Sequence, residues 1–185
     1  MNRFTYIIIA IICLICVSCV KEKREATYTS QESKIDQYIT SKMYVKGENG
    51  TDTLTVVYNG GANRLVLQEG DGEELLSNGM VSFYYAGYTF TNNKSASNLF
   101  TTNHEATATA AGWDLTDADY ELLTIELNSA DLMTGLKDGL KGAKSGEHCE
   151  ILFSGKYGFG KKPIGIVSAN SALLFEIWVE AVSNE

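Results

Sequence analysis

Residues 131–179 read DLMTGLKDGLKGAKSGEHCEILFSGKYGFGKKPIGIVSANSALLFEIWV, and this stretch decides the fold. Apolar side chains recur in its first part at steps of three and four residues, which predicts a short amphipathic helix carrying Leu132, Met133, Leu136, Leu140 and Ala143. Gly142 and Gly146 end this helix and turn the chain. The alternation over 148–153 then predicts a strand with one buried face, and 172–179 predicts a second strand.

The loop between these two strands is unusually apolar. Residues 157–167 are rich in glycine but also carry aromatic and branched side chains, at Tyr157, Phe159, Ile164, Ile166 and Val167. Loops are usually polar, because buried loop backbone is hard to satisfy with hydrogen bonds. We therefore expect this loop to fold over an apolar cleft.

The stretch resembles the C-terminal half of FKBP-type peptidyl-prolyl isomerases. In that family a helix carrying V-I-x-G-W-x-E-G precedes a strand, an A/Y-Y-G loop, an I-P-P-x-A-x-L turn and a final L-x-F-x-V-x-L strand. The matching pieces here are L-M-T-G-L-K-D-G at 132–139, Y-G-F-G at 157–160 and I-V-S-A-N-S-A-L-L-F-E-I at 166–177. Together with 81–89, the likeness covers residues 64–182. The resemblance implies an α+β fold, in which an antiparallel sheet of about five strands wraps around one short α-helix.

The resemblance also implies a pocket lined by aromatic and branched side chains. Its catalytic residues would be Tyr85, Phe159 and Phe175, although a purely structural role in the sheet is the alternative for Tyr85. The residues expected to bind the substrate are Phe100, Thr101, Leu123, Leu132, Met133, Leu136, Ile166 and Val167. The backbone N–H of Met133 would donate a hydrogen bond to the ligand. Such a dry pocket favours the twisted X-Pro amide, whose rotation otherwise crosses a barrier of ~18–20 kcal/mol.

Three residues of this pocket depart from the family pattern. Leu136 stands where the family has a tryptophan at the floor, Phe159 replaces a tyrosine that donates its hydroxyl, and Thr101 replaces an aspartate. Losing one neutral donor commonly costs ~0.5–1.5 kcal/mol, and a smaller floor buries less apolar area. Two functions therefore stay open: an isomerase that helps proteins fold, and a non-catalytic module that binds polypeptides. A structural surface lipoprotein is a third reading, which the apolar 157–167 loop disfavours.

The composition of the chain limits the kinds of molecule that it is expected to bind. The chain has 185 residues, of which 44% are hydrophobic, enough for one folded domain with extensions. The net charge is −8 and the basic residues are scattered, so nucleic-acid binding is not expected. His104 and His148 lie in different segments and no metal motif is present, so we expect neither a metal nor a cofactor. The expected partners are proline-containing polypeptides and, by resemblance, the macrolide ligands of the family.

The N-terminus resembles a bacterial lipoprotein leader. Residues 7–17 are almost wholly apolar but too few to span a bilayer comfortably, and Ser18 and Cys19 end a sequence similar to a lipobox, with Cys16 where leucine is preferred. An ordinary secretory signal or an uncleaved anchor is the alternative. A lipid on Cys19 would hold the protein at the bacterial envelope, on the periplasmic or surface side of the outer membrane. Cys149 would then be the single cysteine left free, and we expect a buried, inert thiol.

These observations divide the chain into three parts. We expect a signal peptide at 1–18, a tether with an N-terminal extension at 19–63, and an FKBP-like domain at 64–185. Within the extension, residues 20–30 are polar and expected to be the tether, and Ser30 is expected to cap a short helix over 32–43.

Turn signals and alternation predict the remaining strands. The turn at 59–61 predicts a hairpin between strands in 51–58 and 65–67, while 81–89 predicts the central strand and 122–127 another. Residues 92–120, including 106–111, show no clear period, and are expected to form an inserted flap beside the pocket. Trp178 should lie on the outward face of the last strand, where we expect the N-terminal hairpin or helix to cover it.

Overall fold

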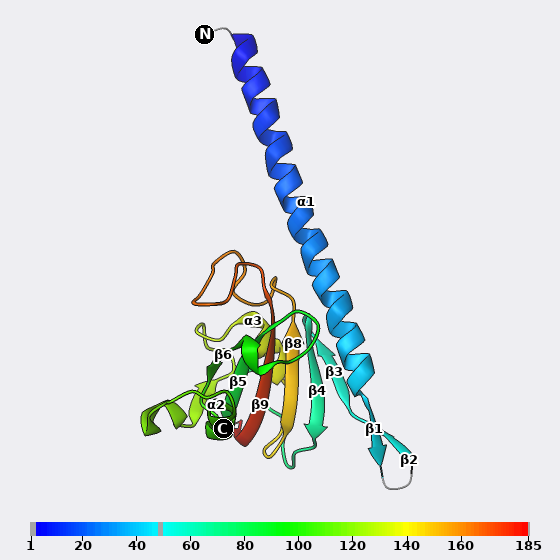
Figure 1. The fold of residues 1–185 in the computed structure, drawn as a ribbon, viewed down its shortest axis with the longest axis vertical. Helices are drawn as coiled ribbons and strands as arrows, with labels where there is room; N and C mark the ends of the chain where they lie inside the picture. Colours follow the sequence, from blue (N-terminus) through cyan, green and yellow to red (C-terminus); the bar gives the residue numbers. More distant parts are fainter. Residues whose placement is uncertain (1–2, 48–49, 185) are drawn as a thin grey trace.

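The computed structural model describes residues 3–47 and 50–184, and its body is one antiparallel sheet with helices on both faces (Figure 1). The sheet has the strand order β3-β4-β8-β9-β5-β6, with β7 also paired to β5. Its strands are β3 (Val56–Asn59), β4 (Ala62–Gln68), β5 (Met80–Phe90), β6 (Leu99–Thr102), β7 (Leu123–Glu126), β8 (His148–Phe153) and β9 (Ala172–Ser183). The other elements are α1 (Arg3–Lys42), α2 (Glu105–Ala110), α3 (Thr134–Leu140), the 3₁₀ turns η1 (Ala96–Asn98) and η2 (Asp117–Tyr120), and the hairpin of β1 (Tyr44–Gly47) and β2 (Gly50–Thr53). The predicted α+β class is confirmed, although the sheet has seven strands rather than five.

The predicted hairpin is formed by β3 and β4. Its turn contains Gly60 and Gly61, whose φ angles of 60° and 105° are unfavourable for residues with a Cβ atom. The register pairs Val57 with Arg64. Because β4 continues to Gln68 and joins β8, the hairpin belongs to the main sheet, and the expected domain boundary at residue 64 lies inside a strand.

Helix α3 packs closely on one face of the sheet. Gly135 and Gly139 face Phe153 and Ile151 on β8, where an added Cβ atom would collide with those side chains. The spacing of four residues between the two glycines places both on the same face of the helix. The helix is shorter than the 132–143 pattern predicts, because Met133 has extended backbone angles and is its N-cap.

Buried Arg64 fixes the other end of α3. Its Nη1 atom donates hydrogen bonds to the carbonyl oxygens of Gly139 and Lys141, at 2.9 and 3.0 Å. Its Nε atom lies 3.2 Å from the carboxylate of Glu147, which is also buried. A cation at a helix C-terminus satisfies free carbonyls and interacts favourably with the helix dipole.

Helix α1 covers the opposite face of the sheet and projects away from the body at its N-terminal end (Figure 1). Ile35, Tyr38 and Ile39 pack in an apolar cluster with Leu152 and Leu174 of the sheet. For this reason both faces of β8 are buried, rather than the one face that the alternation predicts. No helix in the described part of the chain is both long and apolar enough to cross a membrane.

The predictions of a tether at 20–30 and of a helix start at Ser30 are wrong. Helix α1 runs through both positions, because no glycine or proline interrupts this part of the sequence. Tyr28 is only 6% exposed, and its hydroxyl donates a 2.7 Å hydrogen bond to Asn170 Oδ1. The end of the supposed tether is therefore docked on the body.

The 92–120 insertion forms regular secondary structure, although its apolar residues show no clear helical or strand period. It contains η1, β6, α2 and η2, and the alanine- and threonine-rich segment forms helix α2. Alanine has the highest helix propensity, while an amphipathic period is absent because α2 buries only Ala108.

Trp178 on β9 lies on the α1 side of the sheet, as predicted, and is partly buried. It packs against the apolar cluster to which Ile35 and Tyr38 of α1 belong. Its ring is stacked with two imidazoles, at centroid distances of 3.8 Å to His104 and 5.0 Å to His148. The N-terminal helix thus covers this face of the sheet, while the two histidines cover the indole ring.

Candidate functional site

Four aromatic rings from four segments meet on the α3 side of the sheet, and we call them the aromatic cup: Tyr85, Phe100, Phe159 and Phe175. The ring centroid of Phe175 lies 6.4 Å from that of Tyr85 and 5.8 Å from that of Phe100. Phe100 also makes an edge-to-face contact with Phe159 at 6.1 Å. Aromatic pairs favour such offset and edge-to-face arrangements, so the cup is a rigid apolar surface.

Gly87 makes room for this packing. It pairs with Phe175 on β9 and with Thr101 on β6, in the middle of the sheet. A Cβ atom at Gly87 would lie 2.8 Å from Phe175 Cε1 and 3.0 Å from Phe100 Cζ. A side chain here would therefore push the two rings of the cup apart.

The N-terminal end of α3 borders the cup. Leu132, Met133 and Leu136 pack in the same apolar cluster as Phe175, and Leu136 is buried. The N–H of Gly135 donates a 2.9 Å hydrogen bond to the carbonyl of Tyr157, which joins the helix to the loop that carries Phe159. Within the described residues the N–H of Met133 makes no hydrogen bond, so it is available to a ligand.

Of the remaining residues predicted for the site, all but Leu123 lie at the cup or at the cleft beside it. Val167 is buried in the same cluster, and Thr101 and Ile166 line the cleft described next. Leu123 is 37% exposed on β7, opposite Phe83 in the register, and does not join the cup. The structure therefore brings together ten of the eleven residues predicted for the pocket, which are Tyr85, Phe100, Thr101, Leu132, Met133, Leu136, Phe159, Ile166, Val167 and Phe175.

An apolar cleft of about 510 Å³ opens next to the cup. Its walls are Leu99, Phe100, Thr101, Trp113, Phe159, Ile164, Gly165 and Ile166. We call this the insertion cleft, because Trp113 belongs to the inserted segment. The sequence patterns gave no sign of Trp113, since 92–120 lacks a period and a family motif that would place it.

Two polar side chains that the sequence analysis missed hold the strand under the cup. Asn103 is buried; its Oδ1 atom accepts a 2.6 Å hydrogen bond from the Tyr85 N–H, and its Nδ2 atom donates to the Glu121 carbonyl. The hydroxyl of Thr102 donates to the Tyr85 carbonyl at 2.7 Å. Buried polar groups of this kind are normally fully paired, and here they fix the backbone of Tyr85.

A buried ionic cluster occupies the other face of the sheet. Lys94 Nζ lies 2.6 Å from Glu150 and 3.0 Å from Glu176, and Glu176 also pairs with His148 at 3.1 Å. The hydroxyl of Tyr38 on α1 donates to Glu150 at 2.9 Å. The cluster therefore connects α1, the insertion and the two central strands.

The charges in this cluster shift one another's pKa. Burial alone would lower the pKa of Lys94, but the carboxylates of Glu150 and Glu176 outweigh it and raise that pKa above its usual value. Burial likewise raises the pKa of Glu176, but the hydrogen bonds and charges of His148 and Lys94 bring it below the usual range. Both shifts favour the charged forms, as expected for a paired network.

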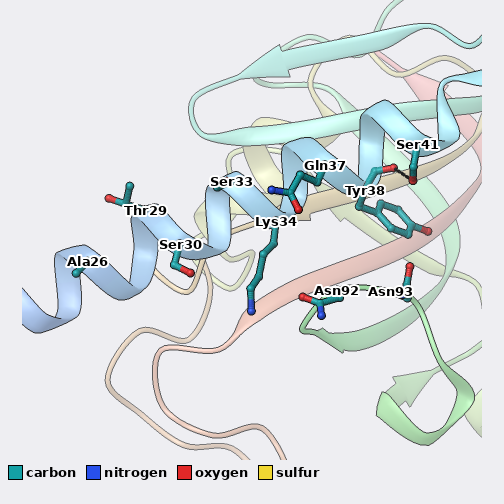
Figure 2. A pocket seen from close by; sticks show the side chains of 10 residues that line it. All are labelled: Ala26, Thr29, Ser30, Ser33, Lys34, Gln37, Tyr38, Ser41, Asn92 and Asn93. Atoms are coloured by element: carbon teal, nitrogen blue, oxygen red, sulfur yellow. Dashed lines mark hydrogen bonds between the residues drawn. The ribbon is translucent and has the colours of Figure 1, made fainter.

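The groove beside α1 offers different chemistry from the cup. This hollow of about 950 Å³ is lined by ten residues, mostly with hydroxyl and amide side chains (Figure 2). Its one aromatic ring is Tyr38, which is buried and bonded to Glu150. Small-molecule sites are mainly apolar with a few placed polar groups, so the cup and its cleft are the better candidate.

Cys149 is fully buried on β8, as predicted. Burial raises the pKa of its thiol well above the usual value, and the carboxylate of Glu147 adds to this effect. Because the thiolate is the reactive form, this cysteine is an inert part of the core.

Comparisons with known proteins agree with this geometry. The profile of the family described as "FKBP-type peptidyl-prolyl cis-trans isomerase" matches residues 72–180. Among solved structures, the chain is similar to FkpA from Escherichia coli, with a TM-score of 0.53 and 18% identity over 99% of this chain and 73% of that one. It is also similar to a peptidyl-prolyl cis-trans isomerase from Pseudomonas syringae, with a TM-score of 0.57 and 16% identity over 86% of this chain and 96% of that one.

A third similar structure contains the three FKBP domains of wheat FKBP73, with a TM-score of 0.56 and 18% identity over 72% of this chain and 52% of that one. No curated protein sequence matches the chain. At these identities the structural likeness shows the fold, while the family profile covers more than half of the chain. The chain belongs to the family of FKBP-type peptidyl-prolyl cis-trans isomerases.

Proposed function

We propose that the protein catalyses cis-trans isomerisation of X-Pro bonds in polypeptides. The observation that carries the proposal is the aromatic cup, in which Phe175 contacts Tyr85 and Phe100 while Phe159 closes the side. Rotation about an X-Pro bond breaks amide resonance, and the twisted amide is less charge-separated than the planar one. A dry apolar cup therefore stabilises the transition state more than the ground state.

The polar groups at the cup would orient the chain. The N–H of Met133 is free to donate to a substrate carbonyl, and the hydroxyl of Tyr85 makes no hydrogen bond within the described residues. Phe159 and Phe175 would form the walls around the proline ring. In this proposal, catalysis comes from binding and orienting the peptide, and it needs no nucleophile or general base.

Restoring one polar group should raise the activity. Phe159→Tyr adds a hydroxyl at the wall of the cup, and we expect kcat/KM for a short X-Pro peptide to rise by up to about tenfold. The measurement is the rate of cis-to-trans isomerisation by the full chain in detergent. Tyr157→Phe, which removes a hydroxyl from the same loop, is the matched control and should leave the rate unchanged. An unchanged rate for Phe159→Tyr would show that this wall does not face the substrate.

A non-catalytic polypeptide-binding module is the second candidate. The departures at Leu136, Thr101 and Phe159 favour it, because they replace the tryptophan, the aspartate and the tyrosine hydroxyl that the family pattern places at the pocket. Such a module would bind an X-Pro peptide without accelerating its isomerisation. Peptide titration and the isomerisation rate, measured on the same preparation, separate the two functions.

We further propose that the protein is anchored in the bacterial envelope by a lipid on Cys19, whose side chain lies outside the described part of the structure. The support is the apolar segment at 7–17 followed by Ser18 and Cys19. Cleavage before Cys19 would leave residues 19–27 of α1 between the lipid and Tyr28, where the helix docks on the body. Because this segment is helical and rises about 1.5 Å per residue, it would be a short rod rather than a flexible tether.

Cys19→Ala tests the anchor. We expect the variant to lack lipid and to leave the membrane fraction when membranes are washed. The measurements are mass spectrometry of the purified protein and its distribution between membrane and soluble fractions. Retention of Cys19→Ala in the membrane through its leader would contradict the lipoprotein proposal.

A further inference from the structure

The N-terminal helix is tied to the loop that supplies one wall of the cup. This loop, residues 154–171, joins β8 to β9 and carries Phe159. The amide of Gln31 on α1 bridges the two ends of the loop. Its Nε2 atom donates a 2.7 Å hydrogen bond to the carbonyl of Asn170, and its Oε1 atom accepts a 2.9 Å hydrogen bond from the N–H of Gly155. An amide has a donor and an acceptor at its tip, so this one side chain holds both ends together.

Two further side chains of α1 bind the same two ends. The hydroxyl of Tyr28 donates a 2.7 Å hydrogen bond to Asn170 Oδ1, and Tyr28 is buried. At the start of the loop, the hydroxyl of fully buried Ser154 donates to the carboxylate of Glu32 at 3.1 Å. Residues three and four apart lie on one face of a helix, so Tyr28, Gln31 and Glu32 form a single row of polar groups toward the loop.

Hydrogen bonds continue from the end of the loop to its aromatic wall. The N–H of Asn170 donates a 2.6 Å hydrogen bond to the carbonyl of Gly160, the residue after Phe159. Asn170 has a φ angle of 59°, a left-handed conformation that asparagine adopts more readily than most residues. The ring of Phe159, which contacts Phe100, is therefore next to a backbone position that α1 holds through Asn170.

The loop depends on such contacts for its shape. It contains four glycines, which have more accessible backbone conformations than other residues. Residues 161–166 are all exposed. Helix α3 holds the first half of the loop, through the hydrogen bond from the Gly135 N–H to the Tyr157 carbonyl. The second half is joined to α1 at Asn170, and segments with few buried contacts open locally at low free energy.

These contacts come from a part of the chain that the family pattern does not include. The family profile matches residues 72–180, whereas Tyr28, Gln31 and Glu32 belong to the N-terminal extension. A role for them at the site therefore cannot be taken from the resemblance, and it depends on the geometry of this chain.

We propose that Gln31 and Tyr28 are positioning residues for the isomerase, which hold the 154–171 loop in the conformation in which Phe159 closes the side of the cup. This inference rests on the proposed function. Without these contacts, only a fraction of the molecules would have the cup closed, and the apparent affinity for the substrate would fall by that fraction. A bound substrate keeps the loop in place, so the loss affects KM rather than kcat.

Gln31→Ala, measured on the full chain in detergent, tests this role. We expect KM for a short X-Pro peptide to rise by about tenfold, because two hydrogen bonds are lost, while kcat changes by less than about twofold. Hydrogen exchange followed by mass spectrometry should become faster at residues 156–169 and stay unchanged in β5 and β9. Thr29→Val is the matched control on the same helix, since the hydroxyl of Thr29 donates to the Glu25 carbonyl within α1, and it should change neither KM nor exchange.

Tyr28→Phe is the second variant. It removes one hydrogen bond and keeps the buried ring, so KM should rise by about threefold, again with kcat nearly unchanged. This variant decides the question if Gln31→Ala fails to fold. A fall in kcat at constant KM, or faster exchange in the whole sheet, would mean that α1 only stabilises the fold and would overturn the proposal. Unchanged KM and unchanged loop exchange would overturn it as well.

The exchange measurement separates this proposal from the isomerase proposal. If the wild type turns over no peptide, the isomerase proposal fails, while exchange in the 154–171 loop still shows whether α1 holds it. Faster exchange confined to this loop in Gln31→Ala would support the positioning of the loop by α1. Exchange equal to that of the wild type would overturn it.

Discussion

Replacing Phe175 by alanine is expected to lower the free energy of unfolding by about 3–5 kcal/mol and to remove the proposed isomerase activity. Phe175 is 3% exposed and contacts the rings of Tyr85, Phe100 and Phe153. The opposing residue is Gly87, which has no side chain to fill the cavity. Urea unfolding followed by circular dichroism measures the loss.

Tyr58→Ala provides the control for this substitution. Tyr58 is 66% exposed on β3, and its loss should change the free energy of unfolding by less than about 0.5 kcal/mol. A destabilisation of less than about 1 kcal/mol by Phe175→Ala would mean that the rings do not form one packed unit.

Lys94→Met is expected to lower the free energy of unfolding by about 3 kcal/mol, the lower end of the range for breaking a buried pair, since Lys94 is 29% exposed. The substitution keeps the length of the side chain but leaves Glu150 and Glu176 buried without their shared cation. Tyr38 and His148 remain as their hydrogen-bonding partners. Chemical denaturation at pH 7 measures the difference from the wild type.

The matched control for Lys94 is Lys144→Met. Lys144 is 4.0 Å from Glu74 in an exposed pair, so its loss should cost less than about 1 kcal/mol. The effect of Lys94→Met should also shrink as the pH falls below 4.5, the ordinary pKa of a glutamate, because the carboxylate of Glu176 protonates under acid conditions. The pKa of Glu176 is lowered in the folded wild type, so the stability it contributes is present above pH 4.5 and is lost under acid conditions. An effect that does not change with pH would contradict the role of charge.

Much of the sheet could be predicted because its signals are local. The alternation at 148–153 and the glycines at 60 and 61 correspond directly to β8 and to the hairpin of β3 and β4. The helical structure of residues 20–30 could not be predicted from their polar composition, since a helical segment whose side chains are mostly exposed has little apolar period. The observation that contradicts the predicted tether is a tertiary contact, because Tyr28 binds Asn170, which is far away in the sequence.

The site residues that lie in the family motifs could be predicted from the sequence, whereas those in the insertion could not. The rings of Phe100, Phe159 and Phe175 meet as the resemblance implies. Leu123 does not join them, because β7 pairs with the first residues of β5, Met80 to Phe83, away from the cup. Asn103 and Trp113 lie in the insertion, where only the three-dimensional packing shows that they contact the site.

The rate of cis-to-trans isomerisation of a Phe-Pro peptide, measured at increasing concentrations of the full-length protein, tests the central claim most directly. An isomerase should raise the rate in proportion to its concentration. The uncatalysed reaction, which is the baseline, takes tens to hundreds of seconds at 25 °C. Phe159→Tyr should give the steeper increase. A rate that stays at the uncatalysed value for both the folded wild type and Phe159→Tyr would contradict the proposed activity and leave the polypeptide-binding module.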